Sequence, residues 1–154
     1  MSSHGSFNCR PTRADARGVI VGLTRYVNKA HLARAALEAT CYQTLDVIGA
    51  MRQDAEIELG NFKVDGGMVV NDLLMQFQAD ILATAVIRPK IIETTVLGAA
   101  YAAGLAIGFW AGPDELRCNW RADRTWQPQI DQPTRQRLHA GWLKAIERSL
   151  DWAQ

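Results

Sequence analysis

Cysteine and histidine are scarce in this chain of 154 residues, which contains three of each. Cys9, Cys41 and Cys118 are widely spaced and form no Cys-x-x-Cys pair. An odd number of scattered cysteines argues against a disulfide framework and a zinc site, so we interpret them as reduced thiols of a cytoplasmic protein. The histidines have no metal-ligand spacing either, and the sequence predicts no metal-binding residues.

An excess of one charge and a long apolar run are also lacking. Lysine and arginine number 17 against 16 acidic residues, so neither a nucleic-acid-binding surface nor an acidic tail is indicated. The longest apolar run, residues 96–111, is shorter than the roughly 20 residues of a membrane helix. Residues 1–13 have no apolar core and are not a signal peptide. The remaining composition, 48% apolar and 21% charged, is typical of one soluble globular domain.

The chain is organised around residues 62–78, where a short strand is followed by a glycine turn. Phe62 and Val64 alternate with polar neighbours, which is typical of a strand. Gly66 and Gly67 then supply backbone freedom and leave room for a close approach, and we expect a positive φ at Gly67.

A helix over about 69–83 is predicted after this turn, because apolar residues recur at helical spacing. The stripe consists of Val70, Leu74, Phe77 and Ile81. A helix that starts just after a glycine turn points unpaired N–H groups into it, which suits a phosphate or a nucleotide. The motif is neither a Walker loop nor Gly-x-Gly-x-x-Gly, and a plain tight connection in an α/β domain is the alternative.

The rest of the chain predicts an α/β layered domain over residues 15–154, with crossovers that imply parallel strands. β-Branched runs predict strands at 19–23 and 86–87, and periodicity predicts helices at about 29–53, 94–109 and 133–152. We expect residues 1–14, which are polar, to be a disordered leader, and residues between 118 and 132 to be irregular.

Three of the predicted helices carry further expectations. Asn28 should cap the first, in which an apolar stripe that includes Leu32 and Val47 faces the sheet and holds a partly buried Gln43. Thr94 or Thr95 should cap the helix over 94–109. Its small residues favour a core helix, with a helix at a domain junction as the alternative.

Three blocks, residues 18–38, 64–82 and 93–104, carry specific motifs. The first contains Gly-Val-Ile-Val-Gly-Leu and His-Leu-Ala-Arg-Ala-Ala-Leu-Glu, the second Val-Asp-Gly-Gly-Met-Val-Val-Asn-Asp, and the third Glu-Thr-Thr-Val-Leu-Gly-Ala-Ala-Tyr. In order and spacing they resemble the second signature, the adenosine motif and the hinge helix of the glycerol kinase group in the FGGY carbohydrate kinase family. The resemblance covers residues 17 to about 152, so we expect the leader over residues 1–14 to be unrelated to the family. Val96 stands where the family usually has alanine.

The resemblance implies a ribonuclease-H-like domain of the actin and hexokinase type, with ATP in the cleft between two such domains. It implies transfer of the ATP γ-phosphoryl group, with Mg²⁺, to a terminal hydroxyl of glycerol. On the matching motif, Gly67 borders the nucleotide, Asn71 contacts the adenine, and Asp65 and Gly66 shape the turn.

The glycerol pocket, the catalytic aspartate and the phosphate-binding hairpin of that family lie upstream of the matching part. We therefore expect a nucleotide-side domain that is incomplete at its N-terminal edge and has no catalytic residues of its own. It should bind ATP weakly, self-associate, and need an N-terminal kinase domain before it acts on glycerol. The alternatives are a kinase for another polyol or sugar and a non-catalytic interaction module. In some bacterial relatives a phosphotransferase-system protein binds the segment matching residues 128–133, but the expected pattern is not preserved here.

Overall fold

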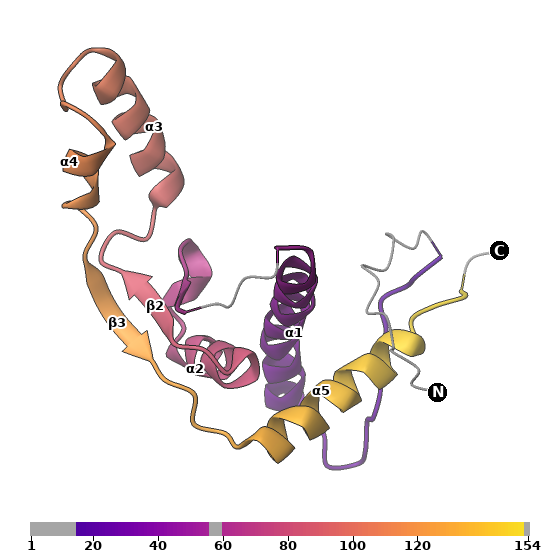
Figure 1. The fold of residues 1–154 in the computed structure, drawn as a ribbon. Coiled ribbons are helices and arrows are strands. Elements are labelled where there is room, and N and C mark those ends of the chain that lie inside the picture. The colour runs from indigo at the N-terminus through magenta and orange to yellow at the C-terminus, as the bar shows by residue number, and fades with distance from the viewer. Residues whose placement is uncertain (1–14, 56–59, 153–154) are drawn as a thin grey trace, which may run out of the picture. The chain divides into compact units, whose positions relative to one another are not determined.

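The computed structural model describes residues 15–55 and 60–152, so the predicted leader over residues 1–14 lies outside the described residues. The elements follow one another in the order α1, β1, η1, α2, β2, α3, α4, β3, α5 (Figure 1). The chain divides into two compact units, one of residues 1–58 with 130–154 and one of residues 59–129.

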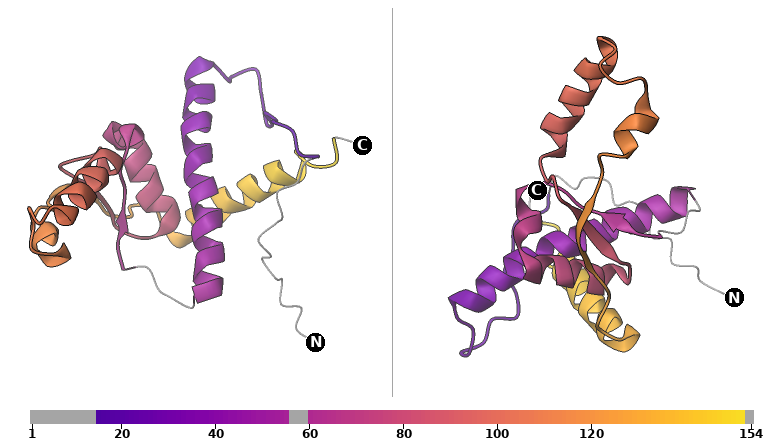
Figure 2. Two further views of the ribbon diagram at one scale, coloured as in Figure 1. Left: turned by 90° about the horizontal axis from the view of Figure 1, so that it is seen from above. Right: turned by 90° about the vertical axis from the view of Figure 1, so that its left-hand side faces the viewer.

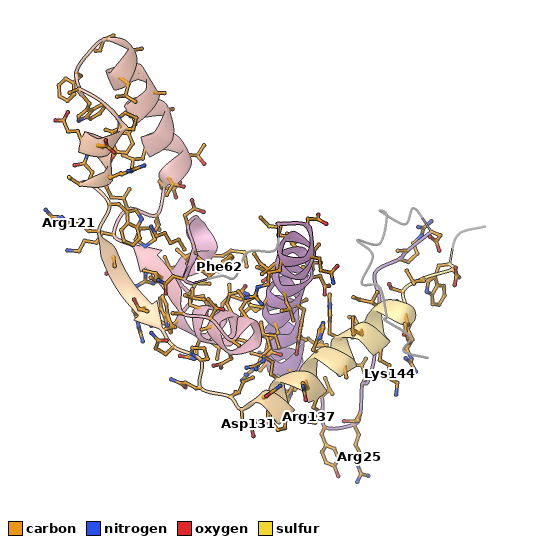
Figure 3. The ribbon with its side chains drawn as sticks, in the orientation of Figure 1. Arg25, Phe62, Arg121, Asp131, Arg137 and Lys144 are labelled. Carbon is orange, nitrogen blue, oxygen red and sulfur yellow. The ribbon has the colours of Figure 1, made fainter. Side chains whose placement is uncertain are left out.

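The unit of residues 59–129 contains a three-stranded sheet in the order β1-β2-β3. Strand β1 (Phe62–Lys63) pairs in parallel with β2 (Val86–Pro89), which pairs antiparallel with β3 (Ala122–Trp126). The N–H of Phe62 donates to the Ala85 carbonyl at 2.8 Å, and that of Val64 to the Ile87 carbonyl at 3.1 Å. Phe62 opens β1, and Arg121 directly precedes β3 (Figure 3).

Between the two parallel strands lie the 3₁₀ turn η1 (Gly67–Val70) and helix α2 (Asp72–Leu82). The predicted apolar stripe is confirmed at Leu74, Phe77 and Ile81, which are all buried. Val70 is 61% exposed instead, because it belongs to η1 and does not continue the phase of α2. The helix ends at Ala83, which has a φ of 53°. Buried side chains of α2, β2 and β3 form the core of this unit.

Helices α3 (Thr94–Ala106) and α4 (Pro113–Arg117) connect β2 to β3 and project beyond the ends of these strands (Figure 2). Only Gly104 of α3 is buried, so the interpretation of this segment as a core helix was wrong. The capping prediction was also wrong: Glu93 is the N-cap and makes no side-chain cap hydrogen bond. A Cβ atom on Gly104 would overlap the Trp110 ring, which explains the glycine at this position.

The unit of residues 1–58 and 130–154 is built on α1 (Lys29–Ala55) and α5 (Gln132–Glu147). The rings of Tyr42 and Trp142 stack at 5.2 Å, and the Trp142 Nε1–H donates to Asp46 at 2.9 Å. Asn28 caps α1 as predicted, since its Oδ1 accepts from the Ala30 N–H at 3.0 Å. These contacts join two helices that are far apart in the sequence.

Two expectations for this unit were wrong. Residues 19–23 form no strand, because no other segment among the described residues pairs with them, and Ile20 and Leu23 are 69% and 59% exposed. The expected buried stripe of α1 is exposed at Leu32, Gln43 and Val47. The buried face of the helix is formed by Cys41, Tyr42 and Ile48. In the described ranges, no helix is both long and apolar enough to cross a membrane.

Candidate nucleotide site

The predicted glycine turn lies directly between β1 and α2. Gly66 has φ 84° and ψ 175°, which a side chain would strain, and its N–H donates to the Ile92 carbonyl at 2.8 Å. The left-handed backbone is therefore at Gly66, and the expectation of a positive φ at Gly67 was wrong. Glycine is required at position 66 by the conformation of the turn itself.

Gly67 has a different reason for being glycine. It is exposed, and a Cβ built on it would meet no atom within 4 Å. Neither backbone conformation nor neighbouring atoms of this chain exclude a side chain here. The open space beside the Gly67 backbone is the kind of space that a bound ligand could occupy.

Asn71 follows η1 as the N-cap of α2. Its Oδ1 accepts from the Leu74 N–H at 3.1 Å, which satisfies one of the unpaired donors of the first helical turn. The side-chain Nδ2 has no partner among the residues that the structure describes. The side-chain oxygen therefore caps the helix, and the N–H donors of the side-chain nitrogen remain available for a ligand.

The turn is anchored to the connection between β2 and α3. The Thr94 hydroxyl donates to Asp65, and the Gly66 N–H donates to the Ile92 carbonyl, as noted above. Asp65 therefore shapes the turn by a side-chain hydrogen bond across 29 residues of sequence. This agrees with the expected role of Asp65.

Arg88 of β2 supports the same turn and was missed by sequence reasoning. Its Nη1 donates to the Val69 carbonyl at 3.0 Å, and its Nε donates to Asp123 at 2.8 Å. Its guanidinium also lies 5.2 Å from the centre of the Trp126 ring. No local pattern identifies this arginine, because its partners lie between 16 and 38 positions away in the chain.

The carboxylates around the turn already have partners. Asp72 forms an ion pair with Arg124. Asp80 is buried and accepts from the Gln129 N–H at 2.7 Å and from Gln76 at 3.0 Å. Over the described ranges, no group of three or more His, Cys, Asp or Glu side chains could hold a metal ion.

Two other features are separate from the glycine turn. A mainly apolar cavity of about 230 Å³ lies between the end of β2, α3 and the residues after α4, and its lining includes Pro89, Leu97 and Trp120. Neither Gly67 nor Asn71 lines it. In the other unit, burial raises the pKa of the Cys41 thiol to about 12, so this cysteine stays protonated and is a poor nucleophile.

The family model of the FGGY family of carbohydrate kinases, C-terminal domain, matches residues 3–107. Glycerol kinase from Chloroflexus aggregans is 66% identical over 142 residues, which are 92% of this chain and 28% of the relative. Glycerol kinase from Acidiphilium cryptum is 60% identical over 138 residues, or 90% of this chain and 28% of the relative. The chain thus spans little more than a quarter of the curated relatives that it matches.

Solved structures give the same picture. The structure of Plasmodium falciparum glycerol kinase with ADP matches with a TM-score of 0.79 and 35% identity, over 91% of this chain and 28% of that chain. Xylulose kinase from Lactobacillus acidophilus matches with a TM-score of 0.71 over 88% of this chain and 28% of that chain, but at 24% identity. The second match shows the fold alone.

Proposed function

The chain belongs to the FGGY family of carbohydrate kinases, and from that premise we propose that it is the nucleotide-side domain of a glycerol kinase. Its fold is the α/β, ribonuclease-H-like fold of the actin and hexokinase class. The observation that carries the proposal is the turn formed by Gly66 and the exposed Gly67, followed by Asn71, in a chain 66% identical to glycerol kinases. The match at 35% identity to a glycerol kinase, against 24% to a xylulose kinase, favours glycerol over another sugar or polyol.

The turn binds and orients the adenosine part of ATP. The Gly67 backbone borders the nucleotide, because no side chain fills the space beside it. Asn71 contacts the adenine with its Nδ2, since its Oδ1 is held by the Leu74 N–H. Gly66 and Asp65 fix the turn so that these two groups have constant positions.

The chemical step belongs to the complete enzyme, in which the ATP γ-phosphoryl group passes to a terminal hydroxyl of glycerol. Phosphoryl transfer needs charge stabilisation and a group that takes the hydroxyl proton. Here Asp65, Asp72 and Asp80 all have partners, which supports structural and not catalytic roles for these three carboxylates. The family's Mg²⁺ accompanies ATP in the complete enzyme, and no step through it is assigned to these residues.

The partners of this chain are ATP and an N-terminal kinase domain that carries the glycerol pocket, and together they act in the cytoplasm. The chain matches only 28% of the length of the related glycerol kinase, which supports a second domain as its partner. Exposed apolar side chains of the unit of residues 59–129 support self-association of the chain when it is alone.

Titration of the chain with ADP, followed by the amide NMR signals of Gly66, Gly67 and Asn71, tests the nucleotide site. We expect shifts at these signals in the wild type, and loss of ADP binding in Gly67→Val, because the branched side chain occupies the open space. Thermal unfolding is the control: nothing within 4 Å opposes a Cβ at this position, so the variant should remain folded. ADP binding by Gly67→Val with unchanged affinity would contradict the assignment.

A further inference from the structure

We propose that Arg88 is a positioning residue for nucleotide binding, which sets the distance and orientation of Asn71 relative to Gly67. This inference rests on the proposed function. It goes beyond that function in assigning control of the site to a residue of β2 that is not itself in the glycine turn.

Arg88 joins three segments of the unit of residues 59–129. Its Nη1 donates to the Val69 carbonyl of η1 at 3.0 Å and lies 3.7 Å from Asp72 at the start of α2. Its Nε and Nη2 lie 2.8 Å and 2.6 Å from the same Asp123 oxygen in β3. The side chain is only 17% exposed, so a change of its partners would leave a mostly buried charge unpaired.

The Val69 carbonyl, which accepts from Arg88, lies in the turn between the two proposed nucleotide-binding residues. Val69 is 3% exposed and sits between Gly67 and Asn71 in the 3₁₀ turn. Within the turn, the Val69 nitrogen lies 3.3 Å from the Gly66 carbonyl oxygen, beyond the usual upper limit of about 3.2 Å, and the Asn71 N–H donates to the Met68 carbonyl at 3.1 Å. Short 3₁₀ segments have poor internal hydrogen-bond geometry. The bond from Arg88 therefore adds an external constraint to a turn that constrains itself weakly.

The planar shape of arginine is essential to this arrangement. A guanidinium offers five donors in a fixed fork, so one side chain reaches the Val69 carbonyl and Asp123 at the same time. A lysine keeps the positive charge but presents it at one point on a flexible stem. Arg88→Lys therefore preserves charge while it removes the simultaneous contacts.

Arg124 of β3 is a matched control. It pairs with the same Asp72 and lies 4.9 Å from the centre of the same Trp126 ring. Its side chain is 51% exposed, and it makes no hydrogen bond to Val69 or to any other η1 carbonyl among the described residues. Arg124→Lys therefore alters the ion pair and the ring contact while the bond that defines the proposal remains.

The experiment compares Arg88→Lys, Arg124→Lys and the wild type in the whole chain, with ADP and GDP as probes. Arg88→Lys should weaken ADP binding about fivefold, the equivalent of one lost hydrogen bond. It should weaken GDP binding less, because the displaced Asn71 amide reads the adenine. A merely structural loss would lower both affinities in proportion. Arg124→Lys should bind ADP within about twofold of the wild type.

Hydrogen exchange without nucleotide separates this inference from the proposed function. In Arg88→Lys the Val69 and Asn71 amides should exchange faster than in Arg124→Lys, whether or not ADP binds. Equal exchange in the two variants, or ADP binding by Arg88→Lys at the wild-type affinity, would overturn the proposal. If Arg88→Lys does not fold, Asp123→Ala takes its place: it removes the carboxylate that anchors the guanidinium on β3. The same comparisons of exchange and affinity then decide.

Discussion

Under the proposed function, Asn71 serves both the fold and the nucleotide site. Its Oδ1 accepts the Leu74 N–H at 3.1 Å and starts α2, whereas its Nδ2 is available to a ligand. The two roles use opposite ends of the same amide, so substitutions can separate them. The loss of nucleotide affinity in a single alanine variant would therefore combine two effects.

Two substitutions of Asn71 distinguish these effects. Asn71→Ala should lower the free energy of unfolding by about 1 kcal/mol through the lost cap, and weaken ADP binding by about 1 kcal/mol through the lost donor. Asn71→Ser retains a capping oxygen, so it should lose the affinity but keep most of the stability. Urea unfolding and ADP titration of the two variants measure the difference. Wild-type affinity in the serine variant would show that the amide does not contact the adenine.

At the scale of elements, α1 and α2 could be predicted because their long helical patterns depend on local sequence. Strand β3 was missed because its first four side chains are exposed and include Asp123 and Arg124, so no apolar alternation marks it. The strand exists through its pairing with β2. Residues 19–23 have the opposite outcome: they have strand composition but no partner among the described residues. The formation of a strand depends on partners that are distant in sequence, and so does the role of Arg88, so neither could be predicted from local sequence.

The N-terminus of α5 gives a pH-dependent prediction. Hydrogen bonds from the Thr134 side chain and backbone N–H hold the pKa of Asp131 below its ordinary value of 3.8. Because the folded-state pKa is depressed, the stabilisation is complete above pH 3.8 and is lost as the pH falls through the lower folded-state value. Asp131, at the start of α5 (Figure 3), accepts the Thr134 N–H at 3.0 Å and is the cap concerned.

Asp131→Asn is the matched variant, since asparagine caps a helix about as well but does not titrate in this range. The wild type should lose stability relative to the variant as the pH falls from about 4 to 2. Above pH 5 the difference should be constant. Chemical unfolding at several pH values, followed by circular dichroism, measures this difference. A difference that does not change below pH 4 would contradict the role of the carboxylate.

At the scale of the whole molecule, we expect exposed apolar side chains to govern self-association. Val96, Ile107 and Phe109 are 69%, 81% and 72% exposed, in and just after a helix with one buried residue. We expect the isolated chain to self-associate, and Ile107→Thr with Phe109→Ser to shift it toward the monomer. Analytical ultracentrifugation measures the change, with the exposed Arg117→Ser as the control. An unchanged distribution in the double variant would show that this surface is not the contact.

Under the proposed function, we expect the activity of the chain to depend on an N-terminal kinase domain. The chain matches 28% of the length of a related glycerol kinase. Its carboxylates at positions 65, 72 and 80 already form structural contacts. Closure of two domains around ATP and glycerol would also exclude water from the reaction. We therefore expect no glycerol-dependent ADP release from the purified chain. The reference is a complete glycerol kinase, and turnover near its rate would show that the chain contains a catalytic site after all.

Addition of the N-terminal part of a related glycerol kinase should restore turnover with the wild-type chain but not with Gly67→Val. Equal restoration by both would mean that the glycine turn does not take part in nucleotide binding.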